Sequence, residues 1–276
     1  MESSIDDAFV ATQGGRLFVR VWGQRERAAE RAPIILFHDS LGSVDLWREF
    51  PSTLAGTTGR AVVAYDRLGF GKSDPHPGVL DFGFVRHEAR STLPALRSAL
   101  GIESMILFGH SVGGAMAMAA AAHFADTTVA VITESVPVFV EDRTLRAIRQ
   151  AKTSFQAPGQ IDRLKRYHGE KAAWVLDAWT ETWLAPRFSG FTLDRYVRRL
   201  RCPLLAIHGD RDEFGSTAHP ERLQALSPSV SEVIVLEDCG HVPHREKSDA
   251  VLGAVTGFLA RLNDVTDPRS QEPPPG

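Results

Sequence analysis

Ser111 stands between glycines in the stretch GHSVGG, after the apolar run MILF and before the alanine-rich run AMAMAAAA. A tight turn from a strand into a helix can hold a serine hydroxyl above a sheet, and small flanking residues avoid clashes with the bent backbone. Free N–H groups at the start of such a helix favour negative charge on a nearby oxygen. The pattern therefore predicts a nucleophilic serine, although a glycine-rich turn with an incidental serine would read the same way.

A serine hydroxyl becomes a good nucleophile only when a base accepts its proton and a carboxylate orients that base. The stretch AIHGDRDEFGS ends one apolar run with Asp210 and Asp212, and VIVLEDCGHVPH ends the next with His241. Each of these groups follows the carboxyl end of an expected strand. The order of serine, acid and histidine predicts that the three meet at one edge of a sheet.

Six short apolar runs are typical of strands buried on both faces: APIILFHD, AVVAYD, SMILFGH, TVAVITES, PLLAIHGD and SEVIVLED. Segments of helical composition lie between several of them, at 47–55, 84–100 and 115–124, and another follows at 248–262. This alternation predicts an α/β fold with a mostly parallel, doubly wound sheet. The stretches AFVAT and RLFVRVWG, which flank QGG, predict an antiparallel hairpin at its start.

One interval is too long for a simple connection between strands. Residues 136–199 separate two expected strands and contain helical patterns rich in arginine, tryptophan and leucine. Connections in compact domains are usually much shorter, so this interval is predicted to be an inserted helical cap. The core would then comprise residues 1–135 and 200–262, and the proline-rich segment 263–276 is predicted to be a disordered tail.

The settings GHSVGG, GDRDEFG and CGHVPH, together with the loop YDRLGFGKSD, resemble the α/β-hydrolase superfamily, in particular serine esterases with an inserted cap. The resemblance covers roughly residues 8–135 and 200–262. It implies that Ser111 attacks a carbonyl, His241 is the general base, and Asp212, the second acid of the pattern G-D-x-D, orients the histidine. Asp210 would brace the turn. Some members carry the acid after the preceding strand, where this chain has Glu134, so Glu134 is an alternative acid.

The same resemblance implies an oxyanion hole made by the backbone N–H groups of Val112 and Ser40. Ser40 lies in HDSLGS, where family members usually have His-Gly, so Asp39 replaces a glycine. Aspartate tolerates left-handed backbone better than most residues. Its carboxylate would oppose the oxyanion if it pointed inward. The stretch DSLGSVDLW also resembles the NSLG loop of enol-lactone hydrolases.

Aromatic residues of the cap are candidates for substrate binding. Trp179 and Trp183 lie four positions apart on one expected helical face, and Phe139 and Phe214 lie near strand ends. Most aromatic stripes of this kind serve packing. A cap that closes over the expected site would nevertheless need an apolar wall, and these four side chains suit an acyl or aromatic group.

Composition restricts the partners. The net charge of −3 provides no basic field for nucleic acid or an anionic membrane, so a small-molecule substrate is expected. The first residues, MESSIDDAFV, lack the features of a signal peptide, and no apolar run is long enough to span a bilayer, which favours a cytoplasmic protein. Cys202 and Cys239 are expected to be free thiols at opposite sheet edges. The sequence predicts no particular oligomeric state.

No metal or cofactor is expected. His244 follows His241 closely, but no third ligand stands at a useful spacing. The stretch GFGKS lacks the first glycine of a phosphate-binding loop. The remaining histidines considered, His123, His168 and His219, are expected to face solvent.

These expectations favour a serine hydrolase that cleaves a small carboxylic ester or lactone through an acyl-enzyme intermediate. One alternative is hydrolysis of a carbon–carbon bond in a ketonic substrate, which some members of the family perform with the same three residues. Another is a receptor that binds a small ligand on the same fold without turnover.

Overall fold

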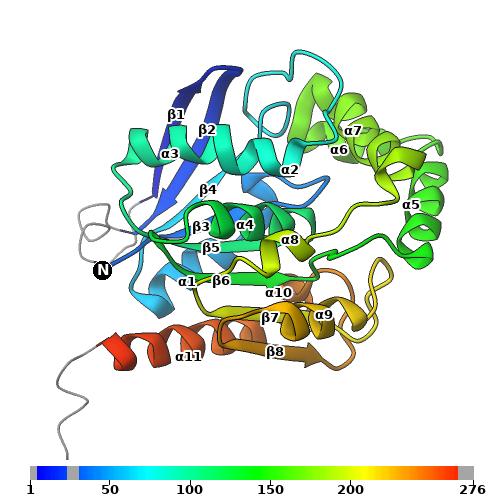
Figure 1. The fold of residues 1–276 in the computed structure, drawn as a ribbon. Helices are drawn as coiled ribbons and strands as arrows, with labels where there is room; N and C mark the ends of the chain where they lie inside the picture. Colours follow the sequence, from blue (N-terminus) through cyan, green and yellow to red (C-terminus); the bar gives the residue numbers. More distant parts are fainter. Residues whose placement is uncertain (1–4, 24–30, 267–276) are drawn as a thin grey trace, which may run out of the picture.

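The computed structural model describes residues 5–23 and 31–266, which contain an eight-stranded sheet with the order β1-β2-β4-β3-β5-β6-β7-β8 (Figure 1). β1 (Ile5–Thr12) and β2 (Gly15–Trp22) form an antiparallel hairpin, and β2 pairs antiparallel with β4. The other strands run parallel: β3 (Ile34–Phe37), β4 (Val62–Tyr65), β5 (Met105–His110), β6 (Thr128–Glu134), β7 (Leu204–Gly209) and β8 (Ser231–Leu236).

The expected hairpin and the six expected strands are confirmed. Every residue of β3, β4, β5 and β7 is buried, because helices cover both faces of the sheet. On one face, the apolar core joins the sheet to α2 (Phe84–His87), the π-helical η3 (Glu88–Thr92), α3 (Leu93–Leu100), α4 (Val112–His123) and α9 (Ala218–Leu226). On the other face, it joins the sheet to α1 (Phe50–Thr58) and α11 (Ser248–Thr266).

Three helix boundaries differ from expectation. Residues Val44–Trp47 form the 3₁₀ turn η2, and α1 begins only at Phe50. α4 already begins at Val112, because the chain turns sharply at Ser111 and the following glycines are helical. At the other end, α11 continues past Leu262 to Thr266, so the first part of the expected disordered tail is helical. The rest of that tail, 267–276, lies outside the described residues.

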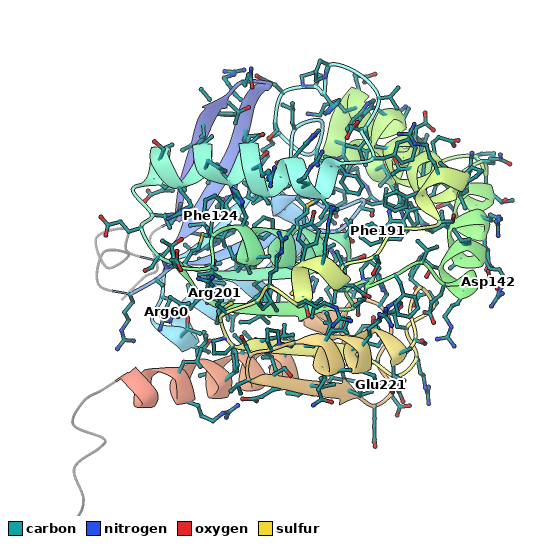
Figure 2. All side chains as sticks on the ribbon, viewed as in Figure 1. Arg60, Phe124, Asp142, Phe191, Arg201 and Glu221 are labelled. Carbon is teal, nitrogen blue, oxygen red and sulfur yellow. The ribbon has the colours of Figure 1, made fainter. Side chains whose placement is uncertain are left out.

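The interval between β6 and β7 forms a group of helices beside the carboxyl ends of the strands (Figure 1). It contains α5 (Asp142–Ser154), α6 (Gln160–His168), η4 (Gly169–Lys171), α7 (Ala172–Leu184), η5 (Pro186–Phe188) and α8 (Asp194–Val197). We call α5 to α7 the cap helices. Charged side chains such as Asp142 on α5 and Glu221 on α9 lie at the outer surface (Figure 2).

The cap helices are tied to the loop that follows β4. His168, at the end of α6, accepts a hydrogen bond at Nδ1 from the N–H of Gly71 (2.9 Å), and its Nε2–H donates to the carbonyl of Leu41 (3.0 Å). The Lys171 ammonium also donates to the carbonyl of Gly71 (2.8 Å). The Trp174 indole lies so close to Gly69 that a Cβ there would come within 2.4 Å of the ring.

The expectation that His168 and His219 face solvent is wrong. Both are almost completely buried, because their ring nitrogens bond to backbone groups of distant loops. The Nδ1 atom of His219 accepts from the N–H of Val138 (3.2 Å). His123, at the last position of α4, is exposed, as expected.

The two cysteines, Cys202 and Cys239, are buried free thiols. They flank the parallel neighbours β7 and β8, one before β7 and one after β8. Within the described ranges, no helix combines the length and apolar character needed to cross a membrane.

Candidate active site

Ser111 occupies the sharp turn between β5 and α4. Its φ of 54° and ψ of −127° are sparsely populated for a residue with a side chain. The turn is held by a hydrogen bond from its N–H to the carbonyl of Glu134 (2.8 Å). A Cβ at Gly109 would lie 2.3 Å from the carbonyl oxygen of Gly113, and a Cβ at Gly113 would lie 2.0 Å from that of Phe37. The glycines are therefore required by close backbone contacts.

The structure brings Ser111, His241 and Asp212 into one hydrogen-bonded chain. The Oγ of Ser111 lies 3.0 Å from Nε2 of His241, although 130 positions separate the two residues. The Nδ1 of His241 lies 2.9 Å from both carboxylate oxygens of Asp212. Since an ionised carboxylate only accepts hydrogen bonds, Nδ1 carries the proton and Nε2 is free to accept the serine proton.

Asp212 follows β7 in a buried loop. Its Oδ1 accepts hydrogen bonds from the N–H groups of Phe214 (2.8 Å) and Gly215 (3.2 Å). Burial by itself would raise the pKa of Asp212, but the hydrogen bond and the charge interaction with His241 outweigh it, so the pKa lies below its ordinary value. Burial likewise opposes the charged form of His241, yet Asp212 raises the pKa of His241 above 6.5.

Glu134, the alternative acid, lies at the end of β6 and bonds to a different histidine. Its Oε2 is 2.7 Å from Nδ1 of His244. Burial raises the pKa of Glu134 to about 8, so the pair holds a proton near neutral pH. The structure thus places Asp212 at His241 and Glu134 at His244. No group of three or more potential metal ligands is found in the part of the chain that the structure describes.

The two expected oxyanion donors lie beside Ser111. Val112 is the first residue of α4, where a backbone N–H has no acceptor within the helix. Ser40 lies on the loop after β3 and lines the same cavity as Ser111. Asp39 lines this cavity too, and its Oδ2 is 3.7 Å from Nδ1 of His110.

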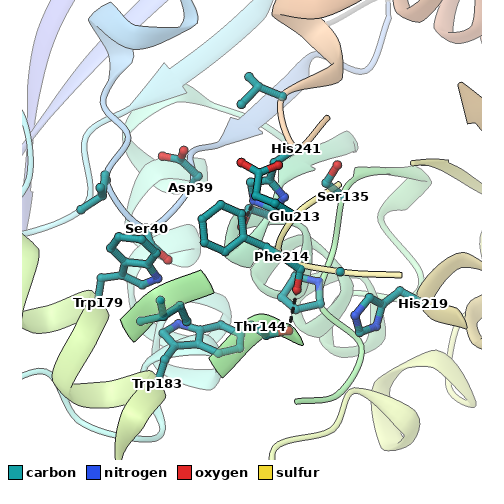
Figure 3. Close-up of a pocket in the computed structure, with 16 residues that line it drawn as sticks. Asp39, Ser40, Ser135, Thr144, Trp179, Trp183, Glu213, Phe214, His219 and His241 are labelled. Carbon is teal, nitrogen blue, oxygen red and sulfur yellow. Dashed lines mark hydrogen bonds between the residues drawn. The ribbon is translucent and has the colours of Figure 1, made fainter. Parts of the chain in front are cut away.

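A cavity of about 190 Å³ opens above Ser111 between the core loops and the cap helices (Figure 3). Three of the four expected substrate-binding residues, Trp179, Trp183 and Phe214, line it. Phe139 is not among the lining residues. Its backbone forms an isolated bridge with Thr192, and its ring packs 4.6 Å from that of His219.

Sequence reasoning missed other residues of the cavity wall. Thr144 and Ile148 lie four positions apart on α5 and line the cavity. Their spacing places them on one face of a helix in the expected cap, and this pattern could have identified them as lining residues. Ser135 also lines the cavity, with a left-handed φ of 47° and a buried hydroxyl that has no partner among the described residues. Glu213 adds a second carboxylate beside Asp39. The lining residues include no lysine or arginine.

The sequence pattern of the alpha/beta hydrolase family matches residues 34–254, which is most of the chain. The chain belongs to the alpha/beta hydrolase family. The match extends over the cap helices as well as both parts of the sheet. The serine turn, the acid loop and the histidine loop described above all lie within it.

Relatives of this alpha/beta hydrolase with known names match over shorter stretches. The chain is similar to proline iminopeptidase from Lactobacillus helveticus, with 33% identity over 38% of this chain and 34% of that protein. It is also similar to human 1-acylglycerol-3-phosphate O-acyltransferase ABHD5, with 35% identity over 33% of this chain and 26% of that protein. The matched stretches therefore span about a third or less of these relatives' lengths.

Solved structures share the fold over nearly the whole chain. A bacterial membrane phospholipase A superposes with a TM-score of 0.78 at 21% identity, covering 94% of this chain and 87% of that one. An esterase from Thermogutta terrifontis superposes with a TM-score of 0.66 at 22% identity, covering 93% of this chain and 99% of that one. At these identities the likeness concerns the fold alone.

Proposed function

We propose that this alpha/beta hydrolase is a serine hydrolase that cleaves small carboxylic esters or lactones. The observation that carries the proposal is the continuous hydrogen-bonded chain from Ser111 through His241 to Asp212, which ends at an apolar cavity. A serine, a neutral imidazole and a buried carboxylate in this order are the components of nucleophilic acyl transfer.

In the proposed first step, the Oγ of Ser111 attacks the carbonyl carbon of the substrate while Nε2 of His241 accepts the hydroxyl proton. The carbonyl oxygen becomes an oxyanion, which the backbone N–H groups of Val112 and Ser40 would stabilise. Asp212 keeps the imidazole in the required tautomer and stabilises its protonated form. His241 then returns the proton to the leaving alcohol, and the acyl group stays on Ser111.

In the second step, water attacks the acyl-enzyme. His241 takes a proton from this water, and the oxyanion forms again at the same donors. Collapse of the intermediate breaks the bond to Oγ, and His241 returns the proton to Ser111. The carboxylic acid leaves, and the enzyme regains its starting state.

The cavity favours a small, largely apolar acyl group. The side chains of Trp179, Trp183 and Phe214 form its wall, and a volume of about 190 Å³ limits the size of the substrate. The carboxylates of Asp39 and Glu213, with no cation among the lining residues, disfavour an anionic substrate. We infer a neutral ester or lactone as the substrate class.

A fluorophosphonate probe tests the nucleophile. We expect the wild-type protein to gain the mass of one probe group and the variant Ser111→Ala to gain none. Absence of labelling in the wild type would contradict the proposal and favour the receptor alternative. Intact-protein mass spectrometry gives the answer without knowledge of the natural substrate.

Substrate assays separate the enzymatic alternatives. We expect turnover of a short-chain 4-nitrophenyl ester, lost in Ser111→Ala. Preferential turnover of a vinylogous diketone would instead indicate carbon–carbon bond hydrolysis. Preferential turnover of proline 4-nitroanilide would indicate the activity for which the Lactobacillus relative is named.

A further inference from the structure

A second, smaller cavity lies among the loop after β3, the end of β5 and α10 (Pro243–Glu246). It measures about 10 Å³ and adjoins the larger cavity through Asp39. Its lining residues include Asp39, Ser43, Trp47, His110 and His244. A space of this size holds one water molecule, provided that polar partners surround it.

Three buried polar atoms on these lining residues have no hydrogen-bond partner among the described residues. They are Oδ1 of Asp39, Oγ of Ser43 and Nε1 of Trp47. Ser43 and Trp47 are only 2% and 3% exposed. Arg245, which also lines the cavity, donates instead to the carbonyl of Leu46. Unpaired buried groups are costly, so three of them around one small cavity indicate a shared polar occupant.

His110 identifies the occupant further. Its Nε2 lies 2.7 Å from the carbonyl oxygen of His241, and because a carbonyl only accepts, Nε2 carries the proton. Burial lowers the pKa of His110 to about 4, so the ring is neutral near pH 7 and Nδ1 has only a lone pair. This lone pair faces Oδ2 of Asp39 at 3.7 Å, which is too long for a hydrogen bond. Two acceptors face each other, and a donor between them is required.

We propose that one ordered water molecule occupies this cavity and links Asp39 to His110, which makes both residues positioning residues for His241. The water would donate its two hydrogens to the Asp39 carboxylate and Nδ1 of His110. Its two lone pairs would accept from the Ser43 hydroxyl and the Trp47 indole N–H. All four hydrogen bonds of the water are then satisfied.

The consequence concerns the catalytic histidine. His110 holds the backbone of His241 through Nε2, and the water and Asp39 fix the tautomer and orientation of His110. The charge of Asp39 also helps to raise the pKa of His241, together with the charges of Asp212 and Glu213. The neighbouring rings of His110 and His208 carry no charge near pH 7, because burial lowers the pKa of each. The aspartate that replaces the family's usual glycine thus acquires a role. This inference rests on the proposed function.

A double-mutant cycle with Asp39→Asn and His110→Leu tests the link, and His110→Gln serves as the rescue variant. The glutamine amide can still donate to the His241 carbonyl, whereas His110→Leu cannot. We expect His110→Leu to lower kcat about tenfold with KM changed less than about twofold, and His110→Gln to recover most of the loss. Asp39→Asn should shift the acid limb of kcat/KM to lower pH, because it removes a negative charge near His241. If the two residues act through one water, Asp39→Asn should lower kcat less in the His110→Leu background than in the wild type, so that kcat of this double variant lies more than about threefold above the product of the two single effects.

Asp45→Asn is the matched control. Asp45 lies in η2, six positions after Asp39, but pairs with Arg20 and Lys72 and does not line the cavity, so the pH profile of this variant should equal that of the wild type. A crystal structure should show a water within hydrogen-bond distance of both Asp39 and His110. No water there, or losses that simply multiply, would overturn the inference. Fluorophosphonate labelling of Ser111 in the wild type is measured alongside, so that failure of the proposed function is recognised separately.

Discussion

Two buried acids near Ser111 have different partners, and the partner determines the role of each. Asp212 bonds Nδ1 of His241, receives two backbone N–H groups and has a lowered pKa. Glu134 bonds His244 and has a pKa raised to about 8. A carboxylate can stabilise an imidazolium only if it is ionised when the proton arrives. Asp212 meets this requirement near neutral pH, and Glu134 does not.

Kinetics of two isosteric variants test this assignment. Asp212→Asn should lower kcat by about 10⁴-fold, because the amide favours the wrong tautomer of His241 while leaving the geometry intact. Glu134→Gln should keep most of the activity, since it contacts neither Ser111 nor His241 through its side chain. Ester hydrolysis measures both variants. Equal losses in the two variants would contradict the assignment.

The raised pKa of Glu134 also predicts a pH dependence of stability. The folded protein holds this proton more tightly than the unfolded chain, whose carboxyl titrates near 4.5, so the contribution to stability is lost as pH rises from that value through about 8. His110 and His244, whose pKa values are lowered to about 4 and about 3, act in the opposite direction but only below about pH 7. Between about pH 7 and pH 8.5, the free energy of unfolding of the wild type should therefore fall more steeply than that of Glu134→Gln.

Urea unfolding at several pH values measures this difference. The His241 contribution is common to both proteins and cancels in the comparison. Parallel stability curves for wild type and Glu134→Gln across this range would show that Glu134 does not titrate there. A steeper fall in the variant would contradict the sign of the effect.

At the scale of elements, hydrogen bonds to loop backbone hold the cap helices in place. His168 satisfies the N–H of Gly71 and the carbonyl of Leu41, which belong to two different loops of the core. On the other side, Thr144 of α5 donates to the carbonyl of Phe214 (2.5 Å), and Arg143 donates to that of Asp212 (3.1 Å). The cap helices therefore brace both the acid loop and the loop after β4.

Replacing His168 by leucine should destabilise the protein strongly. The variant leaves the buried N–H of Gly71 and the partly buried carbonyl of Leu41 without their partner, and a buried unpaired group costs about 1–3 kcal/mol. We expect the free energy of unfolding to fall by about 2–4 kcal/mol, measured by urea denaturation. The control His123→Leu, at the exposed end of α4, should change the free energy of unfolding by less than about 0.5 kcal/mol. Similar changes in both variants would contradict the role of His168.

How far the sequence alone leads depends on the range of the interactions. The strands were predictable because a short, continuous apolar run by itself indicates a strand buried on both faces. The turn at Ser111 was predictable because its glycines contact residues a few positions away or on the neighbouring strand. The burial of His168 and His219 was not predictable, since their partners Gly71 and Val138 lie 97 and 81 positions away. The direction of Asp39 likewise depends on His110, a residue of another strand.

At the scale of the whole molecule, we expect the charge around the cavity to influence the choice of substrate more than the net charge of −3 does. Asp39 and Glu213 lie at the cavity above Ser111, and the lining residues include no cation (Figure 3). Exposed charges are screened by water and salt, so the effect of Glu213, which is exposed, is modest. The Glu213 carboxylate nevertheless repels any anionic group that enters the cavity.

A pair of esters of similar size measures this selectivity: 4-nitrophenyl butyrate, which is neutral, and the 4-nitrophenyl monoester of glutarate, which is anionic. The wild type should prefer the neutral ester, and Glu213→Gln should raise kcat/KM for the anionic ester about three- to tenfold while changing that for the neutral ester little. Glu221→Gln removes the same charge from the outer surface of α9 and should leave the ratio unchanged. High salt should reduce the difference between wild type and Glu213→Gln, because screening weakens the repulsion. An unchanged ratio in Glu213→Gln, or an equal gain in Glu221→Gln, would mean that the cavity carboxylates do not select the substrate charge.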